Sequence, residues 1–507
     1  MKVRNCQPFF GENGEKKCIS KLKKPIKSPI MLDFLTKMGY TNNIILKVGV
    51  EMDQANKAYF EKALHNWCGM IEENTGIDAE YYNNYKVKRG LRNSDGTGVL
   101  AGLTRIGQVH GYILYEGDVI PDEGKLCYRG VDVSQIVKAC EQENRFGFEE
   151  VAYLLLFGKL PTKQELADFC TLVGEMRALP SGFREDMIMK TPGNDVMNKL
   201  ARSVLSMYSY DKTPDDTGLY NLIRQSILLL ARVPTMAAYA YQAKAHYIDG
   251  QSLYIHNPQP ELSTAENFLY MIRPDNKYTD LEAKVLDAAL MLHAEHGGGN
   301  NSAFTTRVVS SSGADTYAAI GAALGSLKGP KHGGANRKVM GMIDDFKQNI
   351  TDITDKDSVA KHIRKILDKE GFDRSGLVYG MGHAIYTISD PRAVALKKKA
   401  EELAYATGNT DEFTLYSLIE ELTPDLLAEK KGQKGNMATC ANVDLYSGFV
   451  YKCLNIPPEL YTPMFAVARI AGWCAHRIEE VLYGGKIIRP AYKGVGGTNA
   501  YVPIDER

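Results

Sequence analysis

Four of the ten histidines, His293, His296, His332 and His383, lie beside glycine-rich turns between residues 293 and 383. A single histidine is more often a structural hydrogen-bonding residue than a catalyst. Several histidines in glycine-flanked turns favour a ligand site instead, because glycine allows the backbone to approach a ligand closely. His362 also falls in this range, but its surroundings are helical and rich in lysine and arginine, so we expect it on the surface.

The stretch HAEHGGGNNS, residues 293–302, is compatible with three kinds of site. His293 and His296 could share one helix face and bind zinc, although the stretch has no HEXXH motif, no nearby cysteine and no evident third ligand. The glycines could hold a phosphate, although no Lys-Ser or Lys-Thr pair follows as in a P-loop. The third interpretation is acid–base chemistry on a small carboxylic acid.

Such chemistry needs an imidazole that polarises a carbonyl, a carboxylate that removes a proton, and arginines that hold the substrate's carboxylates. Asp444, in ANVDLYSG, lies between apolar residues and a turn, where desolvation would raise its pKa and suit it to act as a base. A structural N-cap or turn aspartate is the competing interpretation of Asp444.

Three arginines near the C-terminal end are candidates for binding an anionic substrate. Arg392 lies just inside the start of a predicted helix, where backbone N–H groups favour anions. Arg469 lies in an otherwise apolar helical stretch and therefore needs a partner, either a structural carboxylate or a bound anion. Arg489 follows a Gly-Gly turn and precedes Pro490, which predicts an exposed, extended segment.

Helices must position most of these residues, because capping signals and apolar periodicity recur along the chain. Asp390 and Pro391 are typical of the N-cap and first position of a helix, and we expect Thr462 and Pro463 to play the same parts farther on. The pair Gly484-Gly485 is expected to close that later helix. Two further helices are predicted, over residues 311–325 with Asp315 as N-cap and over residues 358–370.

Only residues 102–132 alternate and turn as strands do. The predicted fold class is therefore mainly α, with a small β portion near the front of the chain. The glycine- and histidine-rich zone lies between helical blocks, where loops on a rigid scaffold commonly carry function. We therefore expect a cleft between two helical domains.

Composition excludes several classes of function. The 507 residues include 61 basic and 61 acidic side chains, so no overall positive field indicates nucleic-acid binding. The longest apolar runs are too short to span a bilayer, which argues against a membrane protein. Nine cysteines without a CxxC pair are typical of reduced thiols in a cytoplasmic protein. Residues 1–50 begin with a basic stretch, which we interpret as a tail or an extra helix without a catalytic role.

The motifs HAEHGGGNNS, GPKHGGAN, GMGHAIYTISDPRA and NVDLYSG occur in this order and resemble the citrate synthase family. The separations match as well, with 36 residues from His296 to His332, 51 from His332 to His383 and 9 from His383 to Arg392. The stretch IPDEGKLCYRGVDV near residue 120 looks like the early hairpin of the family. The resemblance covers about residues 105–490.

The resemblance implies a Claisen-type condensation of acetyl-CoA with oxaloacetate, followed by hydrolysis of citryl-CoA to citrate and CoA. His332 would donate a hydrogen bond to the thioester oxygen, Asp444 would remove a proton from the acetyl methyl group, and His383 would polarise the ketone and protonate the new alkoxide. Oxaloacetate would be bound by His296, Arg392 and Arg469. The resemblance implies no metal and no tightly bound cofactor, with acetyl-CoA acting as a co-substrate.

Arg489 matches a family arginine that reaches into the neighbouring subunit's site, which implies at least a homodimer. The CoA adenine would lie against the following residues: Leu377, Val378, Tyr379, Gly380, Met381, Gly382 and Asn442. A plain turn is the competing interpretation of this loop. Thr387 stands where the family usually has Lys or Arg, and the lysine-rich residues 429–436 could supply the missing charge to CoA or form a solvated loop.

The family also implies two helical domains, the smaller of which is mobile and closes over the larger to exclude water. The large domain would comprise residues 51–332 and the return segment 456–507, and the small domain residues 333–455. The nearest alternative is a 2-methylcitrate synthase using propionyl-CoA, because one methylene contributes only about 1–3 kcal/mol of discrimination. More distant alternatives are a metal-dependent hydrolase built on His293, Glu295 and His296, and a catalytically inactive homologue that binds or regulates.

Overall fold

The computed structural model describes residues 54–116, 118–432 and 439–507. The basic segment 1–50 lies outside the described residues, as do residues 433–436 of the lysine-rich stretch. The described chain forms two compact units. One contains α4 (Gln54–Asn74), α5 (Ala79–Asn84) and the C-terminal segment Lys493–Arg507, with the short helix η6 (Ile504–Glu506).

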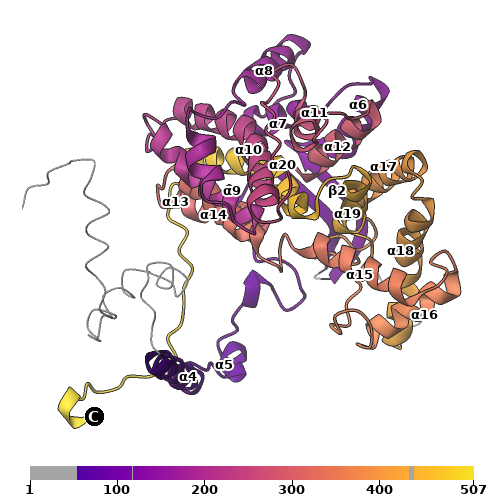
Figure 1. Ribbon diagram of the computed structural model, residues 1–507. Coiled ribbons are helices and arrows are strands. Elements are labelled where there is room, and N and C mark those ends of the chain that lie inside the picture. Colours follow the sequence, from indigo (N-terminus) through magenta and orange to yellow (C-terminus); the bar gives the residue numbers. More distant parts are fainter. Residues whose placement is uncertain (1–53, 117, 433–438) are drawn as a thin grey trace, which may run out of the picture. The chain divides into compact units, whose positions relative to one another are not determined.

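The other unit, Gly90–Tyr492, contains every candidate site residue and is mainly helical, as predicted (Figure 1). Its longer helices are α6 (Val133–Gln142), α7 (Phe148–Phe157), α8 (Lys163–Glu175), α9 (Val196–Ser206), α10 (Leu219–Tyr247), α11 (Thr264–Ile272), α12 (Asp280–His293), α13 (Asn301–Ser311), α14 (Thr316–Lys328), α15 (Ala335–Asn349), α16 (Lys356–Leu367), α17 (Pro391–Thr407), α18 (Thr410–Lys430), α19 (Val443–Cys453) and α20 (Tyr461–Glu479). Shorter turns are η1 (Arg89–Leu91, spanning the start of the unit), η2 (Arg184–Met189), η3 (Met207–Tyr210), η4 (Pro458–Leu460) and η5 (Glu480–Gly484).

Helix α20 is the centre of the hydrophobic core. Every residue from Tyr461 to Ile478 is buried, and the helix contacts α7, α10, α12, α13 and α14. A helix that is apolar on all sides is stable only when neighbours cover it completely. The surrounding helices therefore place the one arginine in its middle turns, Arg469, deep inside the unit.

The small β portion predicted for residues 102–132 is present as one antiparallel sheet in the order β1-β2-β3. Strand β1 (Gly107–Tyr115) pairs with β2 (Asp118–Tyr128), from Gly107 opposite Tyr128 to Tyr115 opposite Asp118, with an irregularity between His110 and Tyr112. The two-residue strand β3 (Val131–Asp132) completes the sheet. The hairpin of β1 and β2 packs against the loop that precedes α17, and this contact bears directly on the site.

The predicted helix starts are confirmed where a local side chain determines them. Asp390 accepts from the N–H of Arg392 and Pro391 is the first residue of α17, while Asp315 accepts from the N–H of Ala318 in α14. Gly485, with φ +67°, follows the last turn after α20, as expected. The helix predicted over residues 358–370 appears as α16, shifted by two to three residues at each end.

The start predicted at Thr462 and Pro463 is wrong. Helix α20 begins at Tyr461, directly after the 3₁₀ turn η4, and Leu460 occupies its N-cap without a side-chain bond. The Thr462 hydroxyl instead donates to the carbonyl of Gly333, 2.9 Å away. The preceding turn therefore starts the helix, and the threonine joins α20 to the segment that leads into α15.

The expectation that His362 lies on the surface is also wrong. His362 is buried, its Nε2 lies 2.7 Å from Asp345 Oδ2, and its ring packs against Phe346 of α15. The reason is helical spacing, since His362 shares a face with Val359 and Ile366, three residues before it and four after. The lysines and arginine of α16 point away from that face.

Helices α15 to α19 contact one another and are drawn in orange tones in Figure 1. They occupy the range predicted for a small domain, residues 333–455, and α17 also contacts α12, α6 and β2. These helices belong to the same compact unit as the rest of Gly90–Tyr492, so the two-domain division stays a prediction. Among the described helices, none is both long and apolar enough to cross a membrane.

Candidate active site

The candidate histidines lie where helices end or have not yet begun. His293 is the last residue of α12 and His296 lies in the turn that follows; His332 lies between α14 and α15; and His383 lies in the loop before α17. Such positions leave the ring partly free while the adjoining helix holds the backbone. His296, His332 and His383 are each partly buried.

Two of these histidines face each other around a tyrosine that the sequence interpretation did not single out. The ring centroids of His296 and His383 lie 5.1 Å apart, at an interplanar angle of 83°. Tyr386 lies 4.7 Å from His383 in a stacked arrangement and 5.7 Å from His296 edge-on. The predicted pairing of His296 with His383 at one site is therefore realised in the structure.

The hydrogen bonds of His383 determine which of its ring nitrogens carries the proton. Its Nδ1 accepts from the backbone N–H groups of Ile385 and Tyr386, at 3.1 and 3.2 Å. Burial, reinforced by Arg392, lowers the pKa of His383 to about 4, so the ring is neutral at physiological pH. A neutral ring that accepts at Nδ1 must carry its proton on Nε2.

His332 is neutral for a similar reason. Burial, together with the charge of Arg469, lowers its pKa to about 4. Its Nε2 lies 3.1 Å from the hydroxyl oxygen of Ser302, and that hydroxyl also lies 2.8 Å from Asn300 Oδ1. The backbone N–H of His332 donates to Gly329, which fixes the turn that presents the ring.

Arg392 is fully charged and buried at the first turn of α17. Its Nε and one terminal nitrogen donate to Asp390, at 3.0 and 2.7 Å, and its guanidinium carbon lies 5.8 Å from the centre of the Tyr386 ring. Burial alone would lower the pKa of Arg392, but the facing Asp390 carboxylate holds it above the usual value. The remaining donors can serve a second anion.

Arg469 is buried, and a buried charge normally needs a paired carboxylate. In the described part of the chain, no carboxylate lies within salt-bridge distance of it. Its Nε is buried and has no hydrogen-bond partner among the described residues. Burial and the nearby Arg392 lower its pKa to about 10, opposed by Asp444 and Glu295. A buried guanidinium with an unused donor, close to a second guanidinium, is suited to bind an anion from outside the chain.

Asp444 lies in the first turn of α19 and is not its cap. Asn442 is the N-cap, and its Oδ1 accepts from the N–H of Asp444 at 3.0 Å. Burial raises the pKa of Asp444 to about 6, although Arg392 and Arg469 both favour the charged form. The raised pKa expected from the sequence is therefore present, and the competing N-cap interpretation is excluded.

These residues share one electrostatic neighbourhood. Burial lowers the pKa of His296 well below its usual value, and four surrounding groups act in the same direction: Arg392, His383, Arg469 and His332. The charges of Arg392 and Arg469 both act to lower the pKa of Asp444. The structure thus brings together six of the seven predicted catalytic and substrate-binding residues: His296, His332, His383, Arg392, Asp444 and Arg469. The seventh, Arg489, is exposed in the extended segment that was predicted for it.

The loop predicted to hold the CoA adenine is tied to the segment before Asp444. Gly382 donates from its backbone N–H to Cys440 at 2.7 Å, and Asn442 donates from its side chain to the Gly382 carbonyl at 2.8 Å. Gly380 has φ +85° and its missing Cβ would lie 2.9 Å from Leu445, so no other residue fits there. Met381 forms an antiparallel bridge with Ala441.

Along this loop, Leu377 is exposed, Val378 is buried, and Tyr379 donates through its hydroxyl to Asp373 at 2.7 Å. The hydroxyl of Thr387, farther along, is buried and has no partner in the described chain. It therefore provides no exposed charge or donor in place of a lysine or arginine. Lys430, from the lysine-rich stretch, pairs with Asp368.

Comparison with known proteins agrees with this geometry. The family model for the citrate synthase C-terminal domain matches residues 95–491, most of the chain. The chain belongs to the citrate synthase family. The resemblance inferred from four motifs is thereby confirmed.

Individual relatives show how far the likeness extends. A citrate synthase of Synechocystis sp. is 35% identical over 429 residues, covering 84% of this chain and 95% of that protein. A citrate synthase of Haloferax volcanii is 33% identical, covering 83% and 99%. A 2-methylcitrate synthase of Corynebacterium glutamicum is 32% identical over 83% of this chain and 99% of its own length.

Solved structures of the family have the same fold. Citrate synthase from Thermotoga maritima superimposes with a TM-score of 0.64 at 30% identity, covering 83% of this chain and 99% of that one. The citrate synthase of Thermoplasma acidophilum, solved as a ternary complex with carboxymethyl coenzyme A and oxaloacetate, gives a TM-score of 0.67 at 26% identity, with the same coverage.

Several supporting residues of this citrate synthase site were not predicted as such. Tyr128, from β2, donates through its hydroxyl to the carbonyls of Met291 and Glu295, at 3.0 and 3.2 Å. Asp390 was predicted as a cap, and it also pairs with Arg392. Contacts between β2 and the end of α12 span more than 160 residues, so no local pattern in the sequence indicates them.

Two further polar residues of HAEHGGGNNS, Glu295 and His293, are buried. Glu295 accepts from His476 Nε2 at 2.9 Å, and Arg307 donates to the other nitrogen of that histidine. His293 stacks on Phe465 with centroids 3.9 Å apart. In the described part of the chain no group of three or more His, Cys, Asp or Glu is arranged to hold a metal ion.

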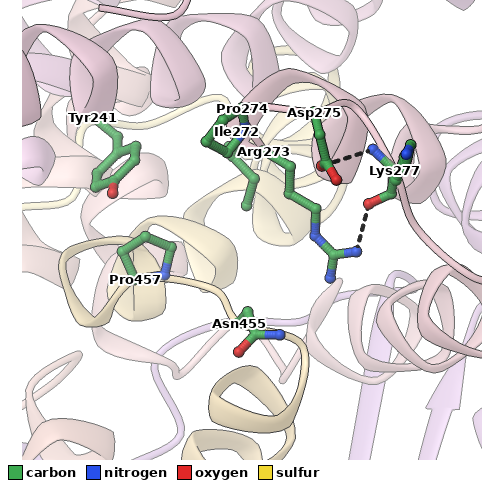
Figure 2. A pocket seen from close by; sticks show the side chains of 8 residues that line it. All are labelled: Tyr241, Ile272, Arg273, Pro274, Asp275, Lys277, Asn455 and Pro457. Carbon is green, nitrogen blue, oxygen red and sulfur yellow. Dashed lines mark hydrogen bonds between the residues drawn. The ribbon is translucent and has the colours of Figure 1, made fainter. Parts of the chain in front are cut away.

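A separate pocket of about 330 Å³ lies between the turn after α11 and the segment after α19 (Figure 2). Arg273 stands at its centre, donates to Glu282 at 2.7 Å and also donates to the carbonyl of Leu454 at 2.7 Å. Asn455 and Pro457 line the opposite side. The candidate catalytic and substrate-binding residues do not line this pocket.

Proposed function

We propose that this chain condenses acetyl-CoA with oxaloacetate to give citryl-CoA and hydrolyses that thioester to citrate and CoA. The observation that carries the proposal is the grouping of a neutral Nε2–H donor, two buried guanidinium groups and a carboxylate with a pKa of about 6. Each has the charge state that one step of this reaction needs.

Oxaloacetate carries two carboxylates, which suit Arg392 and Arg469. Arg469 has an unused buried donor, and Arg392 retains donors beyond those given to Asp390. His296 supplies a further contact from the turn after α12. With the carboxylates held, the Nε2–H of His383 donates to the ketone oxygen and makes the ketone carbon more electrophilic.

Proton removal from the acetyl methyl group needs help, because a thioester α-proton is a very weak acid. Asp444 accepts this proton, while His332 donates a hydrogen bond to the thioester oxygen as negative charge develops on it. The Ser302 hydroxyl oxygen lies 3.1 Å from His332 Nε2 and so holds the ring in place. A fixed neutral donor aimed at the developing oxyanion stabilises the enol without solvent reorganisation.

Carbon–carbon bond formation then follows. The enolate carbon attacks the ketone carbon, the carbonyl electron pair moves to oxygen, and His383 transfers its Nε2 proton to the alkoxide. The proton that Asp444 accepted then replaces the proton that His383 has lost. Water subsequently attacks the citryl thioester and CoA leaves as the thiol. Closure of residues 333–455 over the rest of the unit would exclude water until condensation is complete.

The CoA moiety is proposed to lie along residues 377–382 and Asn442. The positive φ angles of Gly380 and Gly382 and their hydrogen bonds to residues 440–442 support this, because they shape a backbone loop with few side chains. We also propose a homodimer, with Arg489 completing the neighbouring subunit's site. The exposure of Arg489 supports this assignment.

The deciding experiment measures thiol release from acetyl-CoA by the purified chain. We expect release that depends strictly on oxaloacetate, with citrate formed in equal amounts. Equal thiol release with oxaloacetate omitted would identify a thioesterase and contradict the proposal.

A second candidate is 2-methylcitrate synthase, because a relative of that name aligns over most of this chain. The two activities share every residue discussed above and differ in the acyl group. Turnover with acetyl-CoA and with propionyl-CoA, compared as kcat/KM, distinguishes them. A tenfold or greater preference for propionyl-CoA would reverse the order of the two candidates.

A further inference from the structure

Tyr386 lies at the centre of the proposed oxaloacetate site, and its side chain is 1% exposed. Its ring contacts three groups to which the proposed function gives a role. It stacks on His383 at 4.7 Å with an interplanar angle of 29°, meets His296 edge-on at 5.7 Å, and lies 5.8 Å from the guanidinium carbon of Arg392. An aromatic ring in this position constrains both histidines through packing alone.

The backbone of the same residue acts on the same histidine. The N–H of Tyr386, together with that of Ile385, donates to His383 Nδ1. The main chain therefore fixes the tautomer, and the side chain fixes the plane of the ring. Together they determine the direction in which the Nε2–H of His383 points.

The hairpin prevents Tyr386 from moving away. A Cβ on Gly124 would lie 2.9 Å from Cδ1 of Tyr386, and one on Gly111 would lie 3.1 Å from its Cα. Strands β1 and β2 thus lie directly against this residue. Its hydroxyl, by contrast, is buried and has no hydrogen-bond partner among the described residues.

We infer that Tyr386 is a positioning residue, whose ring holds the His383 imidazole in the plane that aims Nε2–H at the ketone of oxaloacetate. The inference rests on the proposed function. The ring is required and the hydroxyl is not, because the contacts to His383, His296 and Arg392 are all made by the ring.

Two substitutions separate the ring from the hydroxyl. Tyr386→Phe keeps the ring and should retain kcat within about threefold. Tyr386→Leu removes it and should lower kcat by about 10–100-fold, because small misplacements of a catalytic group have effects of this size. Tyr386→Met provides a more flexible replacement if the leucine variant does not fold.

The specific readout is the ¹³C NMR shift of oxaloacetate labelled at its ketone carbon and bound to the enzyme without acetyl-CoA. Polarisation by His383 should move this shift downfield in the wild type and in Tyr386→Phe. In Tyr386→Leu and Tyr386→Met the shift should return toward that of free oxaloacetate. Tyr239→Leu, which alters a buried tyrosine of α10 that bonds to His256 and faces Arg184, is the matched control and should keep the downfield shift.

The outcomes distinguish this inference from the proposed function. A wild type that neither shifts the bound ketone nor releases thiol with oxaloacetate overturns both. A wild type that does both, with a leucine or methionine variant that retains the shift and kcat, overturns the positioning role alone. A phenylalanine variant as impaired as the leucine variant also overturns it, since the hydroxyl would then be the group that matters.

Discussion

Asp444 has a pKa of about 6 because the effect of burial outweighs that of two nearby arginines. Burial disfavours its charged form, whereas Arg392 and Arg469 favour it. Without the arginines the pKa of the carboxylate would be higher still, and with full exposure it would be a weaker base. The same arginines are proposed to bind oxaloacetate, so substrate binding partly neutralises them and should strengthen Asp444 as a base.

Asp444→Asn should lower kcat by about 10²–10⁴-fold, the usual contribution of a general base, while leaving oxaloacetate affinity largely intact. Thiol release and calorimetric titration with oxaloacetate measure the two quantities. Asp425→Asn, on the exposed side of α18, is a matched control that should change neither. Near-normal turnover in Asp444→Asn would show that another group removes the proton.

Activity should fall at acidic pH because Asp444 must be deprotonated to act. Its pKa is raised to about 6, so below that value kcat/KM should decrease about tenfold for each pH unit. His332 and His383, with pKa values of about 4, remain neutral over this range and add no step of their own. A rate profile from pH 5 to 8 measures this, and a flat profile down to pH 5 would assign the base elsewhere.

At the scale of elements, the hairpin of β1 and β2 is a structural support for the loop between His383 and Arg392. The backbone N–H of Gly124 donates to the Ser389 hydroxyl at 3.2 Å, and the Ser389 hydroxyl donates to Glu123. Close approach is possible because Gly124 has no side chain. Its Cβ would lie 2.0 Å from the Ser389 carbonyl oxygen.

Gly124→Ala should therefore displace the loop, destabilise the fold by about 1–3 kcal/mol as overpacked positions do, and raise the KM for oxaloacetate. Gly102→Ala is the control, since a Cβ there would meet nothing within 4 Å. Thermal unfolding and steady-state kinetics on both variants provide the comparison. Equal behaviour of the two alanine variants would mean that the hairpin does not support the loop.

Sequence reasoning succeeded at elements whose signals are local. Asp390 and Pro391 start a helix through their own backbone and side chain, and the desolvation of Asp444 follows from its immediate neighbours. Predictions from the sequence were wrong where packing against distant segments determines the local structure. The 3₁₀ turn before α20 and the bond from Thr462 to Gly333 depend on chain packing, and the burial of His362 depends on α15.

The site shows the same contrast. The family resemblance of the motifs implied which side chains meet, whereas the central place of Tyr386 depends on a hairpin more than 250 residues earlier in the chain. The contacts of Tyr128 with Met291 and of Glu295 with His476 could not be predicted from the sequence either, since the partners lie far apart along the chain.

For the whole molecule, the proposed sharing of sites between subunits can be tested with two inactive variants. Arg489→Ala and Asp444→Asn subunits, mixed and allowed to exchange, form hybrids in which one site combines Asp444 with the partner's intact arginine. Random exchange should restore about a quarter of wild-type activity, as isologous dimer geometry requires. No restoration would show that Arg489 acts within its own chain or that the chain works alone.

The cytoplasmic location inferred from the cysteines stays a prediction, which cell fractionation would test. The seven cysteines in the described residues are free thiols, and six of them are at least partly buried: Cys127, Cys140, Cys170, Cys440, Cys453 and Cys474.

The bridge between Met381 and Ala441 has a consequence for anyone who wishes to redesign the acyl preference of this enzyme. Asn442 donates from its side chain to the Gly382 carbonyl and also caps α19, which carries Asp444. Residues 380–382 and the start of α19 are therefore held together as one unit. A library that randomises residues 440–442 would therefore disturb both the loop proposed to bind CoA and the proposed base, and most members should be inactive. Selection for longer acyl chains should proceed faster in libraries that leave residues 440–442 unchanged.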